Sequence, residues 1–232
     1  MTHKIAIGFL SLCLGASAWA IGPDKEDSST NELQRATETI QHLTSAAPDK
    51  GVPNTVLEGA KCIAVIPKLV KGALVVGGEH GKGVATCRTS NGSWSSPAPF
   101  TVTGISWGPQ IGGKSSDLVM FIMNDEGMAS LMRGHIKLGA DVSAAAGPVG
   151  RSASVDAGMK AGILTYSSSK GAFIGASLNG AELQQDKDAT VAWYGRDVAF
   201  SDILKGNVQT QNEDARAFVN AVQNAKETAQ VH

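Results

Sequence analysis

Cysteine is scarce in this chain of 232 residues, which has only Cys13, Cys62 and Cys87. So few cysteines exclude a small scaffold that depends on many disulfides. Cys13 lies in a segment that we expect to be removed, so Cys62 and Cys87 remain, both in strand-like sequence. The sequence leaves open whether these two form a cross-strand disulfide or stay as buried free thiols.

Long apolar runs and a strong excess of either charge are also absent. Beyond residue 20 the longest purely apolar run is Leu118–Met123, which has the length of a buried strand. A membrane-spanning helix needs about 20 apolar residues, so no transmembrane span is expected in the mature chain. The formal net charge is −1, and it becomes −2 when the first 20 residues are removed with Lys4. This balance gives no reason to expect nucleic acid as a partner.

Histidine is sparse as well. His42, His80 and His135 are scattered, without the i,i+4 spacing or the Cys-x-x-Cys pair that is typical of a metal site. No close pair of carboxylates stands out as a general acid and base. We therefore expect no metal ligands, no cofactor and no catalytic residues.

The residues that are present begin with a pattern typical of secretion. Residues 1–20 combine a short positively charged head, an apolar run over 5–14 and the small-residue end Ala18-Trp19-Ala20. This order predicts a signal peptide that is cleaved before Ile21. The expected location is periplasmic or secreted, with peripheral attachment to a membrane as an option. A retained anchor and a lipidated Cys13 are the alternatives.

The periodicity of the remaining chain predicts helices at both ends and a sheet between them. Helical spacing of apolar residues favours helices over Ser28–Ala46 and Asn212–Val231, and a short helix from Pro53 to about Lys61. Glycine-punctuated β-rich segments fill the middle: Cys62–Pro67, Ala73–Gly77, Val84–Ser90, Ser93–Val102, Leu118–Met123, Ile136–Ala144, Ala161–Ser167 and Ala172–Leu178. The expected fold class is α+β, with N-terminal and C-terminal helices packed around a glycine-rich, mostly antiparallel, barrel-like sheet.

Three local patterns refine this plan. Asn91-Gly92 predicts a hairpin turn, and a helix over Glu126–Arg133 is expected after a cap at Asn124 or Asp125. The segment Gly77–Gly83 fails the phosphate-loop pattern, because Gly83 stands where a Ser or Thr is required. We expect that segment to form a wide glycine turn in a hairpin.

Residues 104–108, Gly-Ile-Ser-Trp-Gly, match the G-x-S-x-G pattern of serine hydrolases. That motif requires a strand before the serine and a helix directly after it. Here Pro109 and further glycines follow, and helical periodicity begins only after Asn124. Glycines at tight corners of the sheet are therefore the preferred interpretation, and hydrolysis at Ser106 is a minor alternative.

Charge is distributed unevenly along the chain. Residues 21–60 carry a net charge of −4, residues 61–171 carry +5, and residues 172–232 carry −3. The nearly neutral total therefore conceals a candidate basic face on the sheet. Basic residues that border the glycine turns and strands would hold anionic headgroups if several of them converged.

Motifs between Pro53 and Gly195 resemble the SYLF domain family, in one collinear order. They include Pro53–Lys61 (PNTVLEGAK), Gly81–Arg88 (GKGVATCR), Asn91–Ser95 (NGSWS), Gly108–Gly113 (GPQIGG), Leu138–Gly150 (LGADVSAAAGPVG) with Arg151, and Tyr166–Gly171 (YSSSKG). The resulting organisation is a signal peptide (1–20), an N-terminal helical segment (21–52), a SYLF-like lipid-binding domain (53–195) and a C-terminal helical segment (196–232).

The resemblance implies a lipid-binding module. Eukaryotic relatives bind phosphoinositides, and those in yeast actin patches also bind actin filaments. Bacterial relatives are typically exported stand-alone proteins described as lipid-binding. By this analogy five basic residues on family motifs are the preferred headgroup contacts: Lys61, Lys71, Arg88, Arg151 and Lys170.

Two departures from the family pattern limit the analogy. Eukaryotic members often have an arginine where Glu79 stands, so the same phosphatidylinositol preference is not expected. Some also use a basic amphipathic helix ahead of the domain, whereas Asn31–Leu43 has Glu32 and Glu38 against Arg35 alone. Export makes actin an implausible partner, and we do not expect it.

The leading hypothesis is an exported, non-enzymatic phospholipid-binding protein of the bacterial cell envelope, which holds anionic headgroups on a basic face. The alternative is a structural module that binds envelope protein or glycan through the same face.

Overall fold

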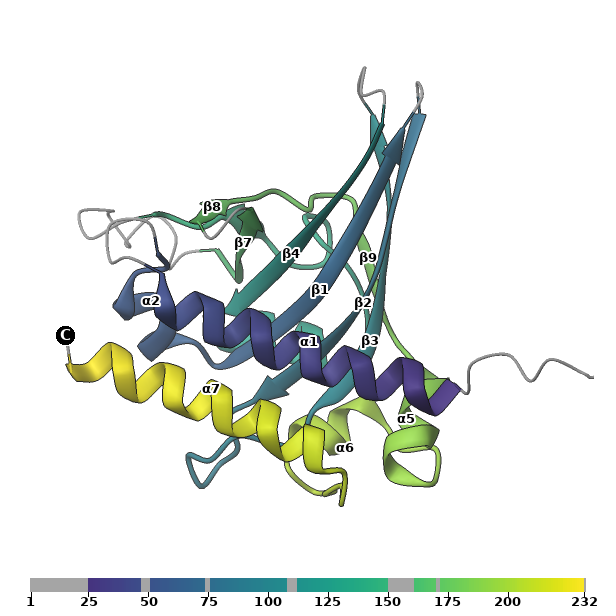
Figure 1. The fold of residues 1–232 in the computed structure, drawn as a ribbon, viewed down its shortest axis with the longest axis vertical. Coiled ribbons are helices and arrows are strands. Elements are labelled where there is room, and N and C mark those ends of the chain that lie inside the picture. Colours follow the sequence, from purple (N-terminus) through teal and green to yellow (C-terminus); the bar gives the residue numbers. More distant parts are fainter. Residues whose placement is uncertain are drawn as a thin grey trace, which may run out of the picture.

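The fold is a curled, half-barrel sheet with helices packed on it (Figure 1). The computed structural model describes residues 25–46, 51–73, 76–107, 112–149, 161–169 and 172–231. Its strands are β1 (Cys62–Ala73), β2 (Val76–Cys87), β3 (Ala98–Trp107), β4 (Gly112–Ile122), β5 (His135–Lys137), β6 (Ala144–Ala146), β7 (Ile163–Ser169), β8 (Ala172–Gly175) and β9 (Glu182–Gln185). Its helices are α1 (Lys25–Ser45), α2 (Asn54–Gly59), α3 (Asp125–Met132), α5 (Lys187–Tyr194), α6 (Phe200–Leu204) and α7 (Glu213–Val231).

The strands form one sheet in the order β5-β9-β3-β2-β1-β4-β7-β6, and β8 also pairs with β7. Among the described strands every pairing is antiparallel except that of β6 with β7. The predicted α+β class with a mostly antiparallel sheet is therefore confirmed.

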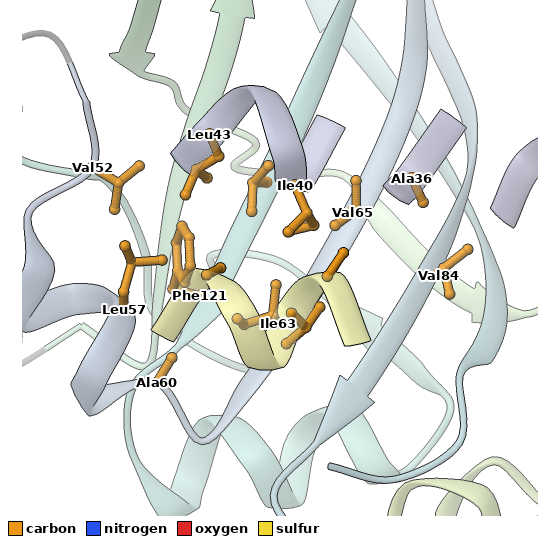
Figure 2. Close-up of a cluster of buried hydrophobic side chains, with 14 of the residues drawn as sticks. Ala36, Ile40, Leu43, Val52, Leu57, Ala60, Ile63, Val65, Val84 and Phe121 are labelled. Carbon is orange, nitrogen blue, oxygen red and sulfur yellow. The ribbon is translucent and has the colours of Figure 1, made fainter. Parts of the chain in front are cut away.

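Two apolar clusters lie on opposite faces of the sheet, as the alternation of side chains along a strand requires. Ile63 and Val65 of β1 lie in a cluster with Leu33 and Ile40 of α1 and with Phe218 of α7. Figure 2 shows this cluster between the sheet and the helices. The alternate residues of the same strand belong to a second cluster with residues of β3, β9, α3 and α6: Cys62, Ala64 and Ile66.

Strands β1 to β4 continue beyond helices α1 and α7 as a projecting arm (Figure 1). We call residues 69–73, 76–81, 102–107 and 112–116 the arm. It begins at a β-bulge in β1, where Lys68 has a φ of +66° and its N–H donates to Asp117 Oδ1 at 3.1 Å. Because of this bulge, Ile66 and Leu69 both face the second cluster. A bulge increases the local twist and bends the strand, which is how the arm leaves the body of the sheet.

The predicted glycine turn over Gly77–Gly83 is wrong, because these residues lie inside strand β2. Close packing explains the glycines. A Cβ on Gly81 would lie 2.6 Å from the Ile66 side chain, and a Cβ on Gly83 would lie 2.5 Å from the Phe100 ring. Glycine within a strand is typical where a neighbour approaches this closely.

Other boundaries differ more modestly from the expectation. The segment expected over Cys62–Pro67 is the first half of the longer strand β1. The separate strand expected over Ala73–Gly77 is wrong, because Ala73 is the last residue of β1 and Val76 is the first residue of β2. The single strand expected over Ile136–Ala144 is two short strands, β5 and β6, separated by a turn at Gly139, which has a φ of +86°. The end helices and the helix near Glu126 are confirmed within a few residues.

Candidate anion-binding site

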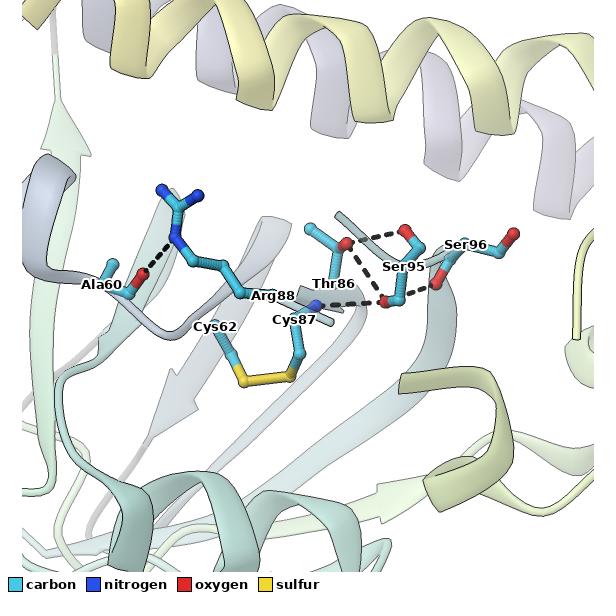
Figure 3. Close-up of a disulfide and its surroundings, with 7 residues drawn as sticks. All are labelled: Ala60, Cys62, Thr86, Cys87, Arg88, Ser95 and Ser96. Atoms are coloured by element: carbon cyan, nitrogen blue, oxygen red, sulfur yellow. Dashed lines mark hydrogen bonds between the residues drawn. A yellow bond between two sulfur atoms is a disulfide. The ribbon is translucent and has the colours of Figure 1, made fainter. Parts of the chain in front are cut away.

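Two of the predicted headgroup contacts, Lys61 and Arg88, lie together at one end of the sheet. Lys61 immediately precedes β1 and Arg88 immediately follows β2, and the Arg88 N–H donates to the Lys61 carbonyl at 2.8 Å. The adjacent residues Cys62 and Cys87 are directly opposite in the β1–β2 register and form a disulfide with an S–S distance of 2.00 Å (Figure 3). The question that the sequence left open is therefore answered in favour of the disulfide.

The guanidinium of Arg88 is held in a partly buried position beside an aromatic ring. Its Nε donates to the carbonyl of Ala60 at 3.1 Å, and its central carbon lies 4.4 Å from the centroid of the Trp94 ring. A cation over a tryptophan face is attracted by the ring quadrupole. The buried Nη2 has no hydrogen-bond partner in the described part of the chain. Burial lowers the pKa of Arg88, because desolvation disfavours its charged form.

Hydrogen bonds fix the segment that carries Trp94 against strand β2. The Thr86 hydroxyl donates to the Ser95 carbonyl at 2.8 Å, and the Cys87 N–H donates to Ser95 Oγ at 3.1 Å (Figure 3). Ser95 is itself buried. The position of Trp94 next to Arg88 is thus set by hydrogen bonds between the end of β2 and Ser95, the residue that follows Trp94.

Lys61 is engaged with a carboxylate, but at the surface. Its Nζ lies 2.7 Å from Asp125 Oδ1, and the Asp125 side chain is 89% exposed. Such an exposed ion pair is worth about 0–1 kcal/mol and is screened by salt. The Lys61 ammonium therefore remains able to exchange Asp125 for another anion.

Lys71 occupies a different place, on the arm. It is ten residues along from Lys61, which corresponds to about 33 Å in an extended strand. Its Nζ lies 2.8 Å from Glu79 Oε2, and the Glu79 side chain is only 7% exposed. A Cβ on the cross-strand neighbour Gly104 would lie 2.6 Å from Glu79 Oε1, so Gly104 makes room for this carboxylate.

The predicted contacts consequently do not form one cluster among the described residues. Lys61 and Arg88 are neighbours, Lys71 is remote from both, and Arg151 and Lys170 lie outside the described residues. Arg88 differs from the two lysines, because no carboxylate within the described ranges forms an ion pair with it. The role of the five residues in binding stays a prediction.

The other sequence motifs have a structural setting as well. Ser106 lies inside strand β3, and the next described element is strand β4 rather than the helix that a nucleophile elbow requires. In the ranges that the structure describes, no group of three or more His, Cys, Asp or Glu side chains is arranged to hold a metal ion. Among those same residues, no helix combines the length and apolarity needed to cross a membrane.

Sequence reasoning missed the stacking of Arg88 on Trp94 and the counter-ions Asp125 and Glu79. The stacking could have been predicted, because Arg88 and Trp94 flank the Asn91-Gly92 turn and so lie on facing sides of the hairpin. The hairpin itself is confirmed by the antiparallel pairing of β2 with β3. Arg88 and Trp94 form an isolated antiparallel β-bridge between its two sides. The counter-ions had no signal in the sequence, since Asp125 is 64 residues from Lys61 along the chain and Glu79 meets Lys71 only through the β1–β2 register.

The sequence of this chain is similar to those of known proteins. The sequence pattern of the Ysc84 family, described as "Las17-binding protein actin regulator", matches residues 103–225. The rat SH3 domain-containing YSC84-like protein 1 is 30% identical over 207 residues, which cover 85% of this chain and 61% of the relative. The human protein of the same name is 30% identical over 184 residues, covering 76% of this chain and 54% of the relative.

The similarity extends to yeast. Protein YSC84 of Saccharomyces cerevisiae is 34% identical over 166 residues, covering 69% of this chain and 35% of the relative. The matches thus span about a third to three-fifths of these longer relatives. The family description names a binding protein and regulator, and none of the relatives' names states an enzyme activity. The family match covers more than half of the sequence, so the chain belongs to the Ysc84 family, the SYLF family that its motifs resemble.

Proposed function

We propose that this protein is an exported, non-enzymatic phospholipid-binding protein of the bacterial cell envelope, which holds anionic headgroups at a basic face of the sheet. The observation that carries the proposal is Arg88. Its guanidinium is partly buried, lacks a carboxylate partner among the described residues and keeps a donor without an acceptor. A cation in this state gains from an anionic ligand.

The chemistry of Arg88 suits a phosphate group. A guanidinium presents its N–H donors in a rigid fork, which matches two oxygens of a phosphate. Partial burial lowers the effective dielectric constant and so strengthens the attraction to an anion. Lys61 supplies a second positive charge at the same end of the sheet, where its carbonyl accepts a hydrogen bond from the main-chain N–H of Arg88.

Vesicle co-sedimentation of the purified protein tests this function. Binding is expected to vesicles that contain phosphatidylglycerol at low salt and to weaken as salt screens the attraction. Arg88→Gln is expected to reduce binding, and Arg88→Lys is expected to restore part of it. Lys137→Gln is the matched control, because Lys137 is exposed on β5, which β9 and β3 separate from β2.

Thermal unfolding of each variant checks that the fold is intact, since Arg88 also contacts Ala60 and Trp94. The proposal fails if the wild-type protein does not sediment with anionic vesicles at low salt. Export is tested separately, by locating the protein in cell fractions and sequencing its N-terminus, with Ile21 as the expected first residue.

A second candidate function is a module that binds envelope protein or glycan through the same face. The family description favours it, because it names a protein, Las17, as a partner of the family. Capture of a defined envelope partner that depends on Arg88, together with no vesicle binding, would support this candidate. Actin is not proposed as a partner for an exported protein.

A further inference from the structure

A small cleft lies between helix α7 and the segment that leads into β3. Its volume is about 180 Å³. One wall is formed by Trp94, Ser95, Ser96 and Pro97, and a second by Gln209, Thr210 and Gln211. The third wall is one face of α7, with Ala215, Arg216, Val219 and Asn220. This volume is below the roughly 300–1,000 Å³ of pockets that enclose whole drug-sized ligands, so it suits a small polar group.

The lining is polar in its larger part and carries a single kind of charge. It contains hydroxyl and amide side chains together with Arg216, and no carboxylate. Arg216 is exposed, and its Nη2 donates to Gln211 Oε1 at 2.7 Å. A guanidinium has five N–H donors, so this bond orients Arg216 and leaves others for a ligand.

The nearest acidic residues along α7 do not neutralise the cleft. Glu213 and Asp214 occupy the first turn of the helix, but neither lines the cleft. Asp214 Oδ1 accepts a hydrogen bond from Gln34 Nε2 of α1 at 3.1 Å, so it is directed toward α1. The side chains that line the cleft therefore carry one positive charge and no negative charge, although the chain as a whole carries −1.

A second cation and an unpaired donor adjoin the wall formed by Trp94. The Trp94 side chain is buried, and its Nε1 has no hydrogen-bond partner within the described ranges. The Arg88 guanidinium, whose Nη2 also lacks such a partner, stacks on the same ring. About 90% or more of buried polar groups in proteins are paired, so two unpaired donors on stacked side chains require an explanation.

We propose that this cleft binds the oxyanion of a phosphate group. Arg216 contacts the oxyanion directly, and Arg88, which stacks on the Trp94 ring, contributes a second positive charge beside the cleft. The side-chain amides of Gln209, Gln211 and Asn220 supply the further N–H donors. The phosphate belongs to a phospholipid headgroup or to a free phosphate compound. The assignment of the phosphate to a lipid rests on the proposed function. The proposal that the cleft binds a phosphate group does not.

The test is a titration followed by NMR of the tryptophan indole N–H groups, with the Trp94 signal assigned from Trp94→Phe. The probes are inorganic phosphate and glycerol 3-phosphate, and glucose serves as the neutral control. Both anions are expected to shift the Trp94 signal in a saturable way. Arg216→Gln is expected to weaken the binding by about tenfold, equivalent to about 1.4 kcal/mol. Lys137→Gln is expected to leave it unchanged.

The outcomes separate this site from the proposed function. If neither anion gives a saturable shift, the proposal that the cleft binds phosphate is wrong, even if the protein binds anionic vesicles. An equal response to glucose also overturns it, in favour of a glycan site. A response to the anions without vesicle binding supports the cleft with a free phosphate ligand and refutes the lipid function. If the anions shift the Trp94 signal and the protein also binds vesicles, loss of vesicle binding in Arg216→Gln supports a lipid headgroup as the ligand.

Discussion

The buried carboxylate of Glu79 holds the ammonium of Lys71, with 2.8 Å between Oε2 and Nζ. The two residues face each other in the β1–β2 register, on the arm beyond the helices. Lys71 is thereby neutralised inside the protein, although the family resemblance marks it as a headgroup contact. Replacing one partner of such a pair changes both the charge of the arm and the stability of the fold.

Glu79→Gln is expected to strengthen binding to phosphatidylglycerol vesicles at low salt. The substitution keeps the shape of the side chain and frees the Lys71 charge, and one basic residue near an acidic surface contributes about 1 kcal/mol, or about fivefold in affinity. Co-sedimentation measures the change. Glu58→Gln on the exposed side of α2 removes the same charge elsewhere and serves as the control. Equal effects of the two substitutions would contradict a specific release of Lys71.

Gly104→Ala is expected to destabilise the arm, because the new Cβ would lie 2.6 Å from Glu79 Oε1 and 2.8 Å from Glu79 Cγ. Overpacking of this kind costs about 1–3 kcal/mol in the free energy of unfolding. Gly72→Ala is the matched control on β1, since a Cβ there would meet nothing within 4 Å. It is expected to be neutral or to stabilise by up to about 1 kcal/mol. Urea denaturation measures both, and similar losses for the two variants would refute the role of Gly104.

Reduction of the Cys62–Cys87 disulfide is expected to destabilise the protein. The bridge joins residues 25 apart in sequence, and closing a loop of that length in the unfolded chain corresponds to about 3.5 kcal/mol in the chain-entropy model. Guanidinium denaturation with and without a reducing agent measures this difference. The double variant Cys62→Ala with Cys87→Ala should match the reduced protein and be insensitive to the reductant; a continued response of that variant would assign the effect elsewhere.

Glu32 on α1 is expected to make stability fall as the pH rises toward neutrality. Burial raises the pKa of Glu32 to about 7 from 4.5, although the charges of Lys82 and Arg35 act in the opposite direction and Asp186 adds to the rise. The folded state therefore binds the proton more tightly than the unfolded state does. The stabilisation is complete below pH 4.5 and is lost between that pH and about 7.

The size of this effect is at most about 3.5 kcal/mol, from about 1.4 kcal/mol per pKa unit. Unfolding free energies measured at pH 5 and pH 8 report it. Glu32→Gln should remove most of the difference, because the amide stays neutral at both values. Glu38→Gln, at an exposed position of the same helix, should leave the difference in place. An unchanged pH dependence in Glu32→Gln would exclude Glu32 as its source.

The amphipathic helices and most strand positions were predictable from the sequence. Leu33, Ile40 and Leu43 recur at helical spacing and are buried on the sheet, as expected. The glycines of β2 misled the prediction, because glycine signals a turn and a tightly packed strand equally well in a single sequence. Only the approach of Ile66 and Phe100 from neighbouring strands distinguishes the two.

The candidate site shows the same division. Its residue types and its family motifs could be read from the sequence, whereas the pairing of Cys62 with Cys87 was left open and came from the structure. Which cations are neutralised could not, because Lys71 and Glu79 meet through cross-strand register and Lys61 meets Asp125 across 64 residues. The sequence by itself determined the terminal helices, most strand positions and the family, since these depend on local periodicity and motif order. The tertiary structure alone decided that Arg88 lies on Trp94 without a carboxylate partner among the described residues, because burial and charge pairing arise from contacts between distant segments.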